Sequence, residues 1–490
     1  EINHSGDGGL YAEMVRNRSF EDNRVPEGCT EEGDHFVSPS GWKLPKKEQA
    51  IPNLAWDHVV DKSEARFALK NENPLNDASP TYGELTIVSV SPGGRAGIAN
   101  EGFWGMAIRP DEQYLLSVFV RAPQGYYGRL LASLESADGE HVYATAELPQ
   151  PTATFTRITA TLRSTGADNR ARLLLSGDTP GTLHFDVVSL FPKATFKNRP
   201  NGLRRDIAEM LSGLRPSFIR FPGGCIVEGF TFQSAWNWKE TVGDIAERPG
   251  RQNLWGYRAS DGLGYHELLQ LAEDLGAEPI VVLNCGMTCQ ARQPMFKPLE
   301  EMDSYIQDVL DAIEYANGGP ETPWGAKRVE NGHPQPFHLK YVTIGNENHG
   351  PEYEKRYRLI ADAVRAKYPD VHIIANSTVS DAPVDFEEHH YYSIPEWFVA
   401  HAHLYDTYDR TKPKVFVSEF AANAAAGKGN LIAAVAESAF MIGLENNSDI
   451  VSMAAYAPLL NNEHDREWPV NLIVFDNHRV YGTPSYHIQK

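Results

Sequence analysis

The stretch YVTIGNENHG, residues 341–350, decides the fold. Its first four residues, Tyr341 to Ile344, have the aromatic and β-branched composition typical of a buried strand, and Gly345 ends the run. Four hydrogen-bonding side chains follow without a gap: Asn346, Glu347, Asn348 and His349. A solvated turn would explain them, and so would a carboxylic acid held at the mouth of a barrel. A second carboxylate in a matching position would favour the barrel.

Six further strand-like runs follow residue 200, and helical runs separate them. Together with the first stretch they read SFIRFPGG, PIVVLNCG, LKYVTIGNE, VHIIANST, VDFEEHHYY, KVFVSEFA and IVSMAAYAP. Alternating strands and helices imply a parallel sheet. With Glu1-Ile2 as the stub of a first strand, and LYAEMVRNRSFE as the helix after it, the strands number eight. The pattern predicts a (β/α)8 TIM barrel.

The sequence changes character between residues 24 and 192. Short alternating runs such as ARFALK, GELTIVSV, QYLLSVFVRA and ARLLLSG recur there, separated by Gly, Pro, Asp and Asn. This pattern predicts an antiparallel β-sandwich inserted after the first βα unit. The expected domains are therefore a catalytic barrel formed by residues 1–23 and 193–490, and an inserted sandwich formed by residues 24–192.

Composition excludes several classes of function. The 490 residues include 45 basic and 65 acidic side chains, a formal charge of −20, which disfavours nucleic acid or an anionic membrane as partner. No apolar run approaches the length of roughly 18 residues that a membrane span needs. Four cysteines are too few for a disulfide scaffold, although Cys285 and Cys289 are close enough in sequence to pair. No histidine or cysteine spacing indicates a metal site, so no metal and no other cofactor is expected.

Glu419 is the second carboxylate. It lies in VFVSEFA, a run that is apolar on both sides of Ser418-Glu419. An unpaired carboxylate there is costly, and a structural salt bridge is the alternative explanation. Active sites of this barrel lie at the carboxyl ends of the strands, where Glu347 and Glu419 would both be. Two carboxylates across a cleft are the minimum for glycoside hydrolysis, because one protonates the leaving oxygen and the other attacks the sugar.

Other polar residues fall beside this pair. Asn346 suits a hydrogen bond to the sugar 2-hydroxyl. His389 and Tyr391 share one face of their strand by the period of two, and could orient the nucleophile or pack on the sugar. Ordinary hydrogen bonding at a barrel mouth is the alternative for both residues.

These residues belong to longer motifs that resemble the α-L-arabinofuranosidases of glycoside hydrolase family 51. The similar segments include RFPGGCIVEG, WGYRASDGLGYHELLQLAEDLGAEPI, YVTIGNEN, HHYYSIPEWF, VFVSEFAAN and NLIVFDNHRVYGTPSYHIQK, and they span nearly the whole chain. The resemblance implies a retaining enzyme with Glu347 as acid/base and Glu419 as nucleophile. It implies substrate-binding positions at Asn346, His389, Tyr391, Cys225, Glu228, Trp255 and Asp261. For the tryptophan, plain packing is the alternative.

Two departures from the family affect the expected boundaries. Members usually carry a further glutamate at the end of strand one, and Glu1 aligns just after that position. They also usually continue past HIQK into a C-terminal β-sandwich, so we expect a chain trimmed at both ends with apolar surface where that sandwich packs. The insertion resembles carbohydrate-binding modules related to family 4. Trp104, Tyr126 and Tyr127 could bind sugar there or serve as core.

The sequence therefore predicts an exo-acting α-L-arabinofuranosidase that acts on arabinoxylan, arabinan and derived arabinose-containing oligosaccharides. The alternatives are an endo-β-glucanase or xylanase on the same barrel, and a non-catalytic carbohydrate-binding protein. No signal peptide is seen, but the chain starts abruptly at EINHSGDGG. A secreted or periplasmic location is expected, with a cytoplasmic one as the alternative.

Overall fold

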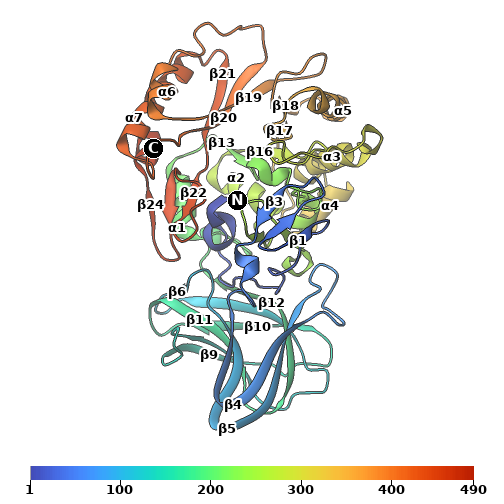
Figure 1. Ribbon diagram of the computed structural model, residues 1–490, viewed down its shortest axis with the longest axis vertical. Coiled ribbons are helices and arrows are strands. Elements are labelled where there is room, and N and C mark those ends of the chain that lie inside the picture. Colours follow the sequence, from blue (N-terminus) through green and yellow to red (C-terminus); the bar gives the residue numbers. More distant parts are fainter. Residues whose placement is uncertain (1) are drawn as a thin grey trace.

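A parallel sheet of seven strands forms the upper part of the computed structural model, which describes residues 2–490 (Figure 1). Its spatial order follows the chain order, and every neighbouring pair is parallel. The strands are β13 (Phe218–Phe221), β16 (Glu278–Leu283), β17 (Tyr341–Ile344), β18 (His372–Ala375), β19 (Phe386–Ser393), β20 (Lys414–Ala422) and β21 (Val451–Tyr456). The seven strands predicted after residue 200 are confirmed.

Helices connect these strands and cover the outside of the sheet (Figure 1). Local signals set their ends: Gly276 ends α2 in the left-handed region, and Pro351 occupies the first turn of α5. The helices are α1 (Arg205–Gly213), α2 (Tyr265–Leu275), α3 (Asp303–Asn317), α4 (Pro323–Glu330), α5 (Pro351–Lys367), α6 (Pro395–Ala400), α7 (Leu431–Asn446) and α8 (Pro484–Gln489). Because each crossover returns the chain to the same end of the sheet, all seven strands present their carboxyl ends together.

The predicted first helix is wrong, and the first strand, predicted at Glu1-Ile2, lies partly outside the described residues. Ile2–His4 is a short 3-10 turn, and Glu1 lies outside the described residues. No helix covers residues 11–23, because their backbone groups bind other elements: the Ala12 N–H donates to the Gly202 carbonyl, and the Met14 N–H to the Leu190 carbonyl. Within residues 2–490 no strand lies between β13 and β21. A cavity of about 430 Å³ opens there, lined by residues 216–226 and 454–460.

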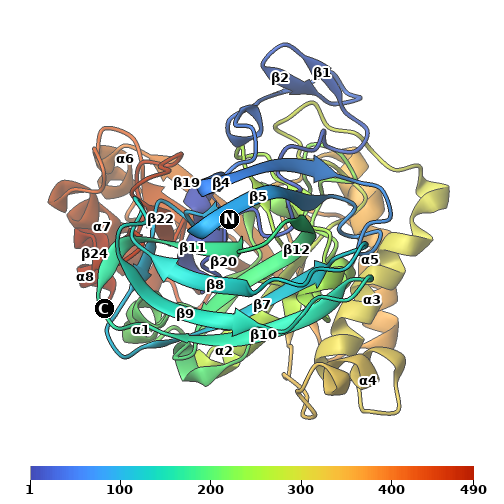
Figure 2. The same cartoon turned by 90° about the horizontal axis from the view of Figure 1, so that it is seen from below.

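A nine-stranded antiparallel sheet forms the lower part (Figures 1 and 2). The order is β10-β7-β12-β5-β11-β8-β9, with β4 beside β5 and β6 beside β11. The first half of β5 pairs with β12 and the second half with β11, and apolar side chains from both halves form one core. The strands are β4 (Trp56–Lys70), β5 (Tyr82–Asn100), β6 (Met106–Ile108), β7 (Gln113–Arg121), β8 (Leu130–Glu135), β9 (Val142–Leu148), β10 (Thr156–Arg163), β11 (Asp168–Gly177) and β12 (Gly181–Pro192).

The three aromatic residues singled out in this region have different surroundings. Tyr126 is buried in the core of the sheet, where its hydroxyl accepts from the Asp178 N–H. The Trp104 ring packs on His464 and beneath the Arg16 guanidinium, at the junction with the upper part. Tyr127 is 95% exposed. Two of the three residues therefore serve packing.

A separate three-stranded sheet precedes the nine-stranded one and lies against the upper part. It consists of β1 (Thr30–Glu32), β2 (His35–Val37) and β3 (Lys43–Pro45). Its buried residues Phe36 and Leu44 pack with Phe230, Leu254 and Cys289, which belong to loops of the upper part. The nine-stranded sheet itself begins only at Trp56, so the boundary at residue 24 stays a prediction.

A buried junction joins the two parts. Glu13 accepts hydrogen bonds from the Leu190 N–H at 2.8 Å and the Ser189 hydroxyl at 2.6 Å, both on β12. Burial raises the pKa of Glu13, and these bonds together with Arg18 only partly offset it. The ends of β12 and the segment after Tyr11 are thus held as one unit.

Apolar side chains remain uncovered on α7. The exposed fractions are 64% for Leu431, 66% for Ile432, 56% for Val435 and 58% for Ile442. None of the helices within residues 2–490 combines the length and apolar character needed to cross a membrane.

Candidate active site

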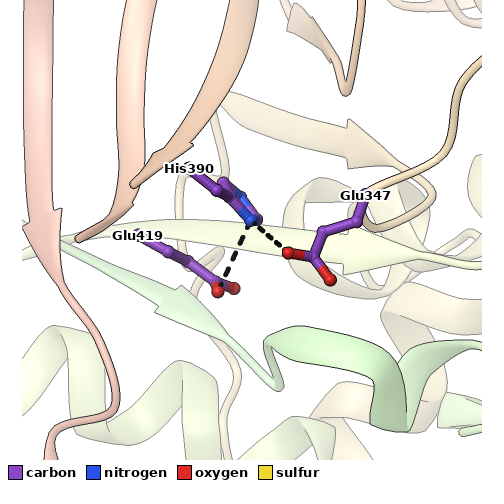
Figure 3. Close-up of side chains that lie close together, drawn as sticks. All are labelled: Glu347, His390 and Glu419. Atoms are coloured by element: carbon purple, nitrogen blue, oxygen red, sulfur yellow. Dashed lines mark hydrogen bonds and ion pairs between the residues drawn. The ribbon is translucent and has the colours of Figure 1, made fainter. Parts of the chain in front are cut away.

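Glu347 and Glu419 face each other across the carboxyl ends of β17 and β20, with His390 of β19 between them (Figure 3). One carboxylate oxygen from each glutamate and one ring nitrogen of His390 all lie within 4.8 Å of one another. His390 Nδ1 is 2.9 Å from Glu347 Oε1 and 3.5 Å from Glu419 Oε2. The two carboxylates found by sequence are therefore one site.

A tight turn after β17 aims Glu347 into this site. Gly345 has φ +80°, and a Cβ there would lie 2.2 Å from the Asn348 side-chain oxygen. Glu347 itself has φ +56°, a conformation that residues with a Cβ rarely adopt. Asn348 stabilises the turn by accepting the Asn346 N–H at 3.2 Å. Backbone strain of this kind at a strand end is typical of functional positions.

Two donors fix the Glu419 carboxylate. Arg220, on β13, donates to Oε1 at 3.0 Å, and the Tyr392 hydroxyl donates to Oε2 at 2.7 Å. Burial, and then the adjacent Glu419, raise the pKa of Tyr392, so its hydroxyl keeps the proton that it donates. Both oxygens of Glu419 thus accept hydrogen bonds, and hydrogen bonds donated to a carboxylate favour its anionic form.

Arg220 also connects Glu419 to the rest of the site. It donates to Glu388 Oε1 at 2.9 Å and to the side-chain oxygen of Asn346 at 2.8 Å. A buried guanidinium is tolerated only where carboxylates balance its charge, and Glu388 and Glu419 do so. One side chain therefore orients the carboxylate of β20 and the amide next to Glu347.

His390 and Glu347 shift each other's titration. Burial lowers the pKa of His390, but Glu419 and Glu347 outweigh it and raise the pKa above its ordinary value. In turn, the hydrogen bond from His390 lowers the pKa of Glu347 in spite of burial. His390 Nε2 is 2.8 Å from the Ser418 hydroxyl, which holds the ring in place. The geometry favours an imidazolium between the two carboxylates.

The structure corrects the prediction for His389 and Tyr391, which point away from the carboxylates. His389 Nδ1 is 2.6 Å from the Tyr405 hydroxyl, and the Tyr391 hydroxyl is 2.8 Å from that same group. Alternation along β19 is regular, so Glu388, His390 and Tyr392 share the face that contacts Arg220, Glu347 and Glu419. His389 and Tyr391 share the opposite face, which packs against Tyr405 and Trp397.

Cys225 and Trp255 do lie at the site. Cys225 follows β13 in the turn η5 (Gly224–Val227), and its Sγ is 3.8 Å from Glu347 Oε2. Trp255 lines the same cavity as Cys225, Tyr392 and Glu419. The expectation that both residues lie beside the glutamates agrees with their position.

Asp261 and Glu228 lie behind the site. Asp261 is buried and accepts from Arg251 Nε at 3.1 Å, so it forms a structural ion pair. Glu228 is 1% exposed. Burial, and then the nearby Cys289, raise the pKa of Glu228 well above its usual range, although the Asn348 side chain and the Asn346 backbone lower it. Contact of Glu228 with a substrate stays a prediction.

Arg220, Glu388, His390 and Tyr392 are site residues that were not predicted from the sequence. Arg220 had a signal, because an arginine inside the buried run FIRF requires a carboxylate partner. The other three share one face of β19, and alternation alone does not tell which face of a strand points into the site.

A cation site is the alternative use of the central trio. Within the described part of the chain, Glu347, His390 and Glu419 are the group of three donors near enough to share an ion. Arg220 already places a positive charge 3.0 Å from Glu419 Oε1, and both nitrogens of His390 are hydrogen-bonded. This donor set suits proton transfer better than metal binding.

Comparisons with known proteins place the chain in a family. The family model described as the α-L-arabinofuranosidase 1 domain matches residues 210–410, and that of the α-L-arabinofuranosidase C-terminal domain matches residues 396–490. α-L-Arabinofuranosidase 2 of Arabidopsis thaliana is 37% identical over all of this chain and 70% of its own length. The extracellular exo-α-L-arabinofuranosidase of Streptomyces chartreusis is 35% identical over all of this chain and 58% of its own length.

A solved structure agrees with these sequence matches. An arabinose-bound GH51 α-L-arabinofuranosidase superposes with a TM-score of 0.87 and 34% identity, over 100% of this chain and 78% of that one. The similarity covers the parallel sheet, the antiparallel sheet and the site between the strand ends. The chain belongs to the α-L-arabinofuranosidases of glycoside hydrolase family 51.

Proposed function

We propose that this chain is a retaining, exo-acting α-L-arabinofuranosidase that removes terminal arabinofuranosyl groups from arabinoxylan, arabinan or their oligosaccharides. The close approach of Glu347 and Glu419, with one oxygen of each within 4.8 Å, carries the proposal. Retaining enzymes hold their carboxyl groups about 5–5.5 Å apart, whereas inverting enzymes leave about 6.5–9.5 Å for a water molecule. The spacing leaves too little room for that water.

Glu419 is the proposed nucleophile. Its two oxygens are bonded to Arg220 and Tyr392, which favour the carboxylate anion that must attack the anomeric carbon. Attack forms a covalent glycosyl ester with Glu419 and breaks the bond to the leaving oxygen. Because Arg220 is itself held by Glu388 and Asn346, the attacking oxygen has one orientation.

Glu347 is the proposed acid/base, and His390 adjusts its charge. To donate a proton Glu347 must first be neutral, yet the hydrogen bond from His390 lowers its pKa. We infer that a sugar entering between the glutamates separates Glu347 from His390, which allows protonation. In the ester intermediate Glu419 is uncharged, so an anionic Glu347 meets less repulsion and is the form required to activate water.

The remaining assignments follow from position. Asn346, Cys225 and Trp255 are proposed to contact the sugar, because they surround the glutamates. We propose that the seven parallel strands belong to a (β/α)8 barrel formed by residues 1–23 and 193–490, with residues 24–192 as an inserted β-sandwich domain. We propose a secreted or periplasmic location; the Streptomyces relative is described as extracellular.

A panel of aryl glycosides tests the proposal. The expected result is rapid hydrolysis of an aryl α-L-arabinofuranoside and slow or no hydrolysis of aryl β-xyloside and β-cellobioside. On arabinoxylan and arabinan, free arabinose should be the product, and polymer length should stay constant. Cleavage of the main chain without release of arabinose would indicate an endo-acting glucanase or xylanase, and binding without any cleavage would indicate a carbohydrate-binding protein.

A further inference from the structure

Two cysteines from different loops are held together beside Glu347. Cys225 lies in the turn after β13, and Cys289 in the loop after β16. The Cys289 N–H donates to the Gly229 carbonyl, and the Gly229 N–H donates to the Cys225 carbonyl, both at 2.9 Å. The side chains of Cys225 and Cys289 pack in the same cluster. The backbone bonds between the two loops therefore hold the two side chains close together.

The pairing differs from the one that sequence proximity suggested. Cys285, only four positions before Cys289, donates instead to the Asn348 side-chain oxygen at 3.4 Å and is fully buried. Cys29 packs at the edge of the three-stranded sheet. The thiol that Cys289 can reach belongs to Cys225, 64 positions earlier in the chain.

The guanidinium of Arg292 lies next to the Cys289 sulfur. Arg292 Nη1 is 3.0 Å from Cys289 Sγ, and the guanidinium lies 5.1 Å from the Trp255 ring centre and 5.7 Å from the Trp42 ring centre. Contact with two aromatic faces keeps the guanidinium in place. The hydrogen bond from Cys225, together with Arg292, lowers the pKa of Cys289 to about 6 in spite of burial. Cys289 is thus the thiolate at neutral pH, and the thiolate is the reactive form.

Cys225, unlike Cys289, is the protonated thiol of the pair, and a carboxylate that can take its proton lies nearby. The half-buried Cys225 keeps its proton, and its Sγ lies 3.8 Å from Glu347 Oε2, which can accept that proton. One reactive thiolate, one protonated thiol in contact with it and a nearby carboxylate are the components of a dithiol that closes on oxidation.

We propose that Cys225 and Cys289 form a site of oxidative modification by hydrogen peroxide or an organic hydroperoxide, which converts them to a disulfide in the wall of the active site. The modification itself does not depend on the proposed function. Its effect on hydrolysis does, because that effect acts through Glu347.

The reaction balances in two steps. The Cys289 thiolate attacks one peroxide oxygen, so an S–O bond forms, the O–O bond breaks and hydroxide leaves, which becomes water on protonation. Cys225 then passes its proton to Glu347 and attacks the Cys289 sulfur, so an S–S bond forms and the S–O bond breaks. The second hydroxide takes the proton from Glu347 and leaves as water. Two thiols lose two electrons to one peroxide.

Closure of the disulfide changes the site directly. It removes the Cys225 thiol from Glu347 and pulls η5 towards the loop that carries Cys289. Small displacements of a catalytic group lower rates steeply, so we expect hydrolysis to fall about tenfold or more. Reduction with dithiothreitol should restore both thiols and the rate.

The test treats the full chain with hydrogen peroxide, then measures mass, peptide map and hydrolysis of an aryl α-L-arabinofuranoside. The expected result is loss of two hydrogen atoms, a Cys225–Cys289 crosslinked peptide and a reversible fall in rate. Cys225→Ser and Cys289→Ser should abolish the crosslink, whereas the matched controls Cys29→Ser and Cys285→Ser should retain it.

Specific outcomes would overturn the proposal. Peroxide treatment that leaves Cys225 and Cys289 as thiols, or that crosslinks another pair, contradicts the site. A complete Cys225–Cys289 crosslink with an unchanged rate contradicts its effect on the active site. Because mass and peptide map need no turnover, failure of the arabinofuranosidase assay would count against the proposed function and leave the test of the dithiol intact.

Discussion

At the scale of single residues, the charge on Glu347 depends on one neighbour. His390 lies 2.9 Å from Glu347 and 3.5 Å from Glu419, so the same imidazole contacts both proposed catalytic groups. Its hydrogen bond lowers the pKa of Glu347, which opposes the acid role and favours the base role. The enzyme therefore needs the substrate to alter this contact between the two steps.

Substitution of His390 should move the pH profile. In His390→Gln the positive neighbour is gone, so the pKa of Glu347 should rise and the protonated acid should persist to higher pH. The alkaline limb of the kcat/KM profile should therefore shift to higher pH. His389→Gln is the matched control, because His389 bonds to Tyr405 on the other face of β19. An alkaline limb that stays in place, or moves to lower pH, contradicts this account of His390.

The two glutamates should differ in their response to the leaving group. Glu419→Ala removes the nucleophile, so every arabinofuranoside should lose turnover. Glu347→Ala should slow natural arabinosides severely but a nitrophenyl arabinofuranoside much less, because that leaving group needs little protonation. Azide should then accelerate the variant by attacking the intermediate without base assistance. Equal loss of turnover on both substrates, with no effect of azide, would show that these roles of Glu347 and Glu419 are wrong.

The residue scale also shows what sequence can and cannot predict. Glu347 and Glu419 were predictable because a carboxylate at the end of an apolar run is costly without a function. His390 and Tyr392 were not, because alternation divides the residues of β19 between two faces without saying which face points into the site. Asp261 matched a pocket motif, but its carboxylate is used by Arg251.

At the scale of elements, the three-stranded sheet β1–β3 supports the site. Its strands are three residues long, and β1 is exposed along its whole length, so alternation of apolar residues gives no signal for them. Leu44 and Phe36 nevertheless pack against the loops that carry Phe230 and Cys289. The long strands of both main sheets were predictable because each buries one or two apolar faces, whereas these short strands depend on contacts with distant loops.

Truncation of Leu44 should loosen this support. Leu44→Ala leaves a cavity beneath the loops, and a buried leucine of this kind contributes about 2–4 kcal/mol to the free energy of unfolding. KM for aryl arabinofuranosides should rise, because Trp255 packs against the same cluster. Val60→Ala, on the exposed side of β4, is the control and should change neither quantity. Denaturant unfolding measures the free energy of unfolding, and steady-state kinetics measures KM. An unchanged KM in Leu44→Ala would show that β1–β3 does not support the site.

At the scale of the whole molecule, the junction decides whether the two main parts are independent. Residues 10–21, LYAEMVRNRSFE, were predicted as a helix, and the segment instead bonds to Gly202 of the upper part and to Leu190 of β12. Long-range pairing of this kind has no local signal in the sequence, whereas the antiparallel strands were visible as short alternating runs. Deletion of the lower sheet would remove Leu190 and Ser189, which bind this segment.

Two contacts across the junction should differ in their contribution. Glu13→Ala strands the Ser189 hydroxyl and the Leu190 N–H in a buried setting, which should lower the free energy of unfolding by about 3 kcal/mol. Arg157→Ala breaks an exposed ion pair with Asp244 and should cost about 1 kcal/mol or less. Denaturant unfolding compares the two variants. Similar losses in both would show that the buried junction is not what joins the parts.

If Glu419 is the nucleophile, it carries the sugar during turnover, and mass spectrometry of a trapped intermediate can detect the ester. Glu347→Ala is mixed with an activated aryl α-L-arabinofuranoside, quenched in acid and digested. We expect one pentosyl group on the peptide that contains Glu419, and its disappearance when azide is added before the quench. Steady turnover without any adduct, or a pentosyl group on another residue, would show that Glu419 is not the nucleophile.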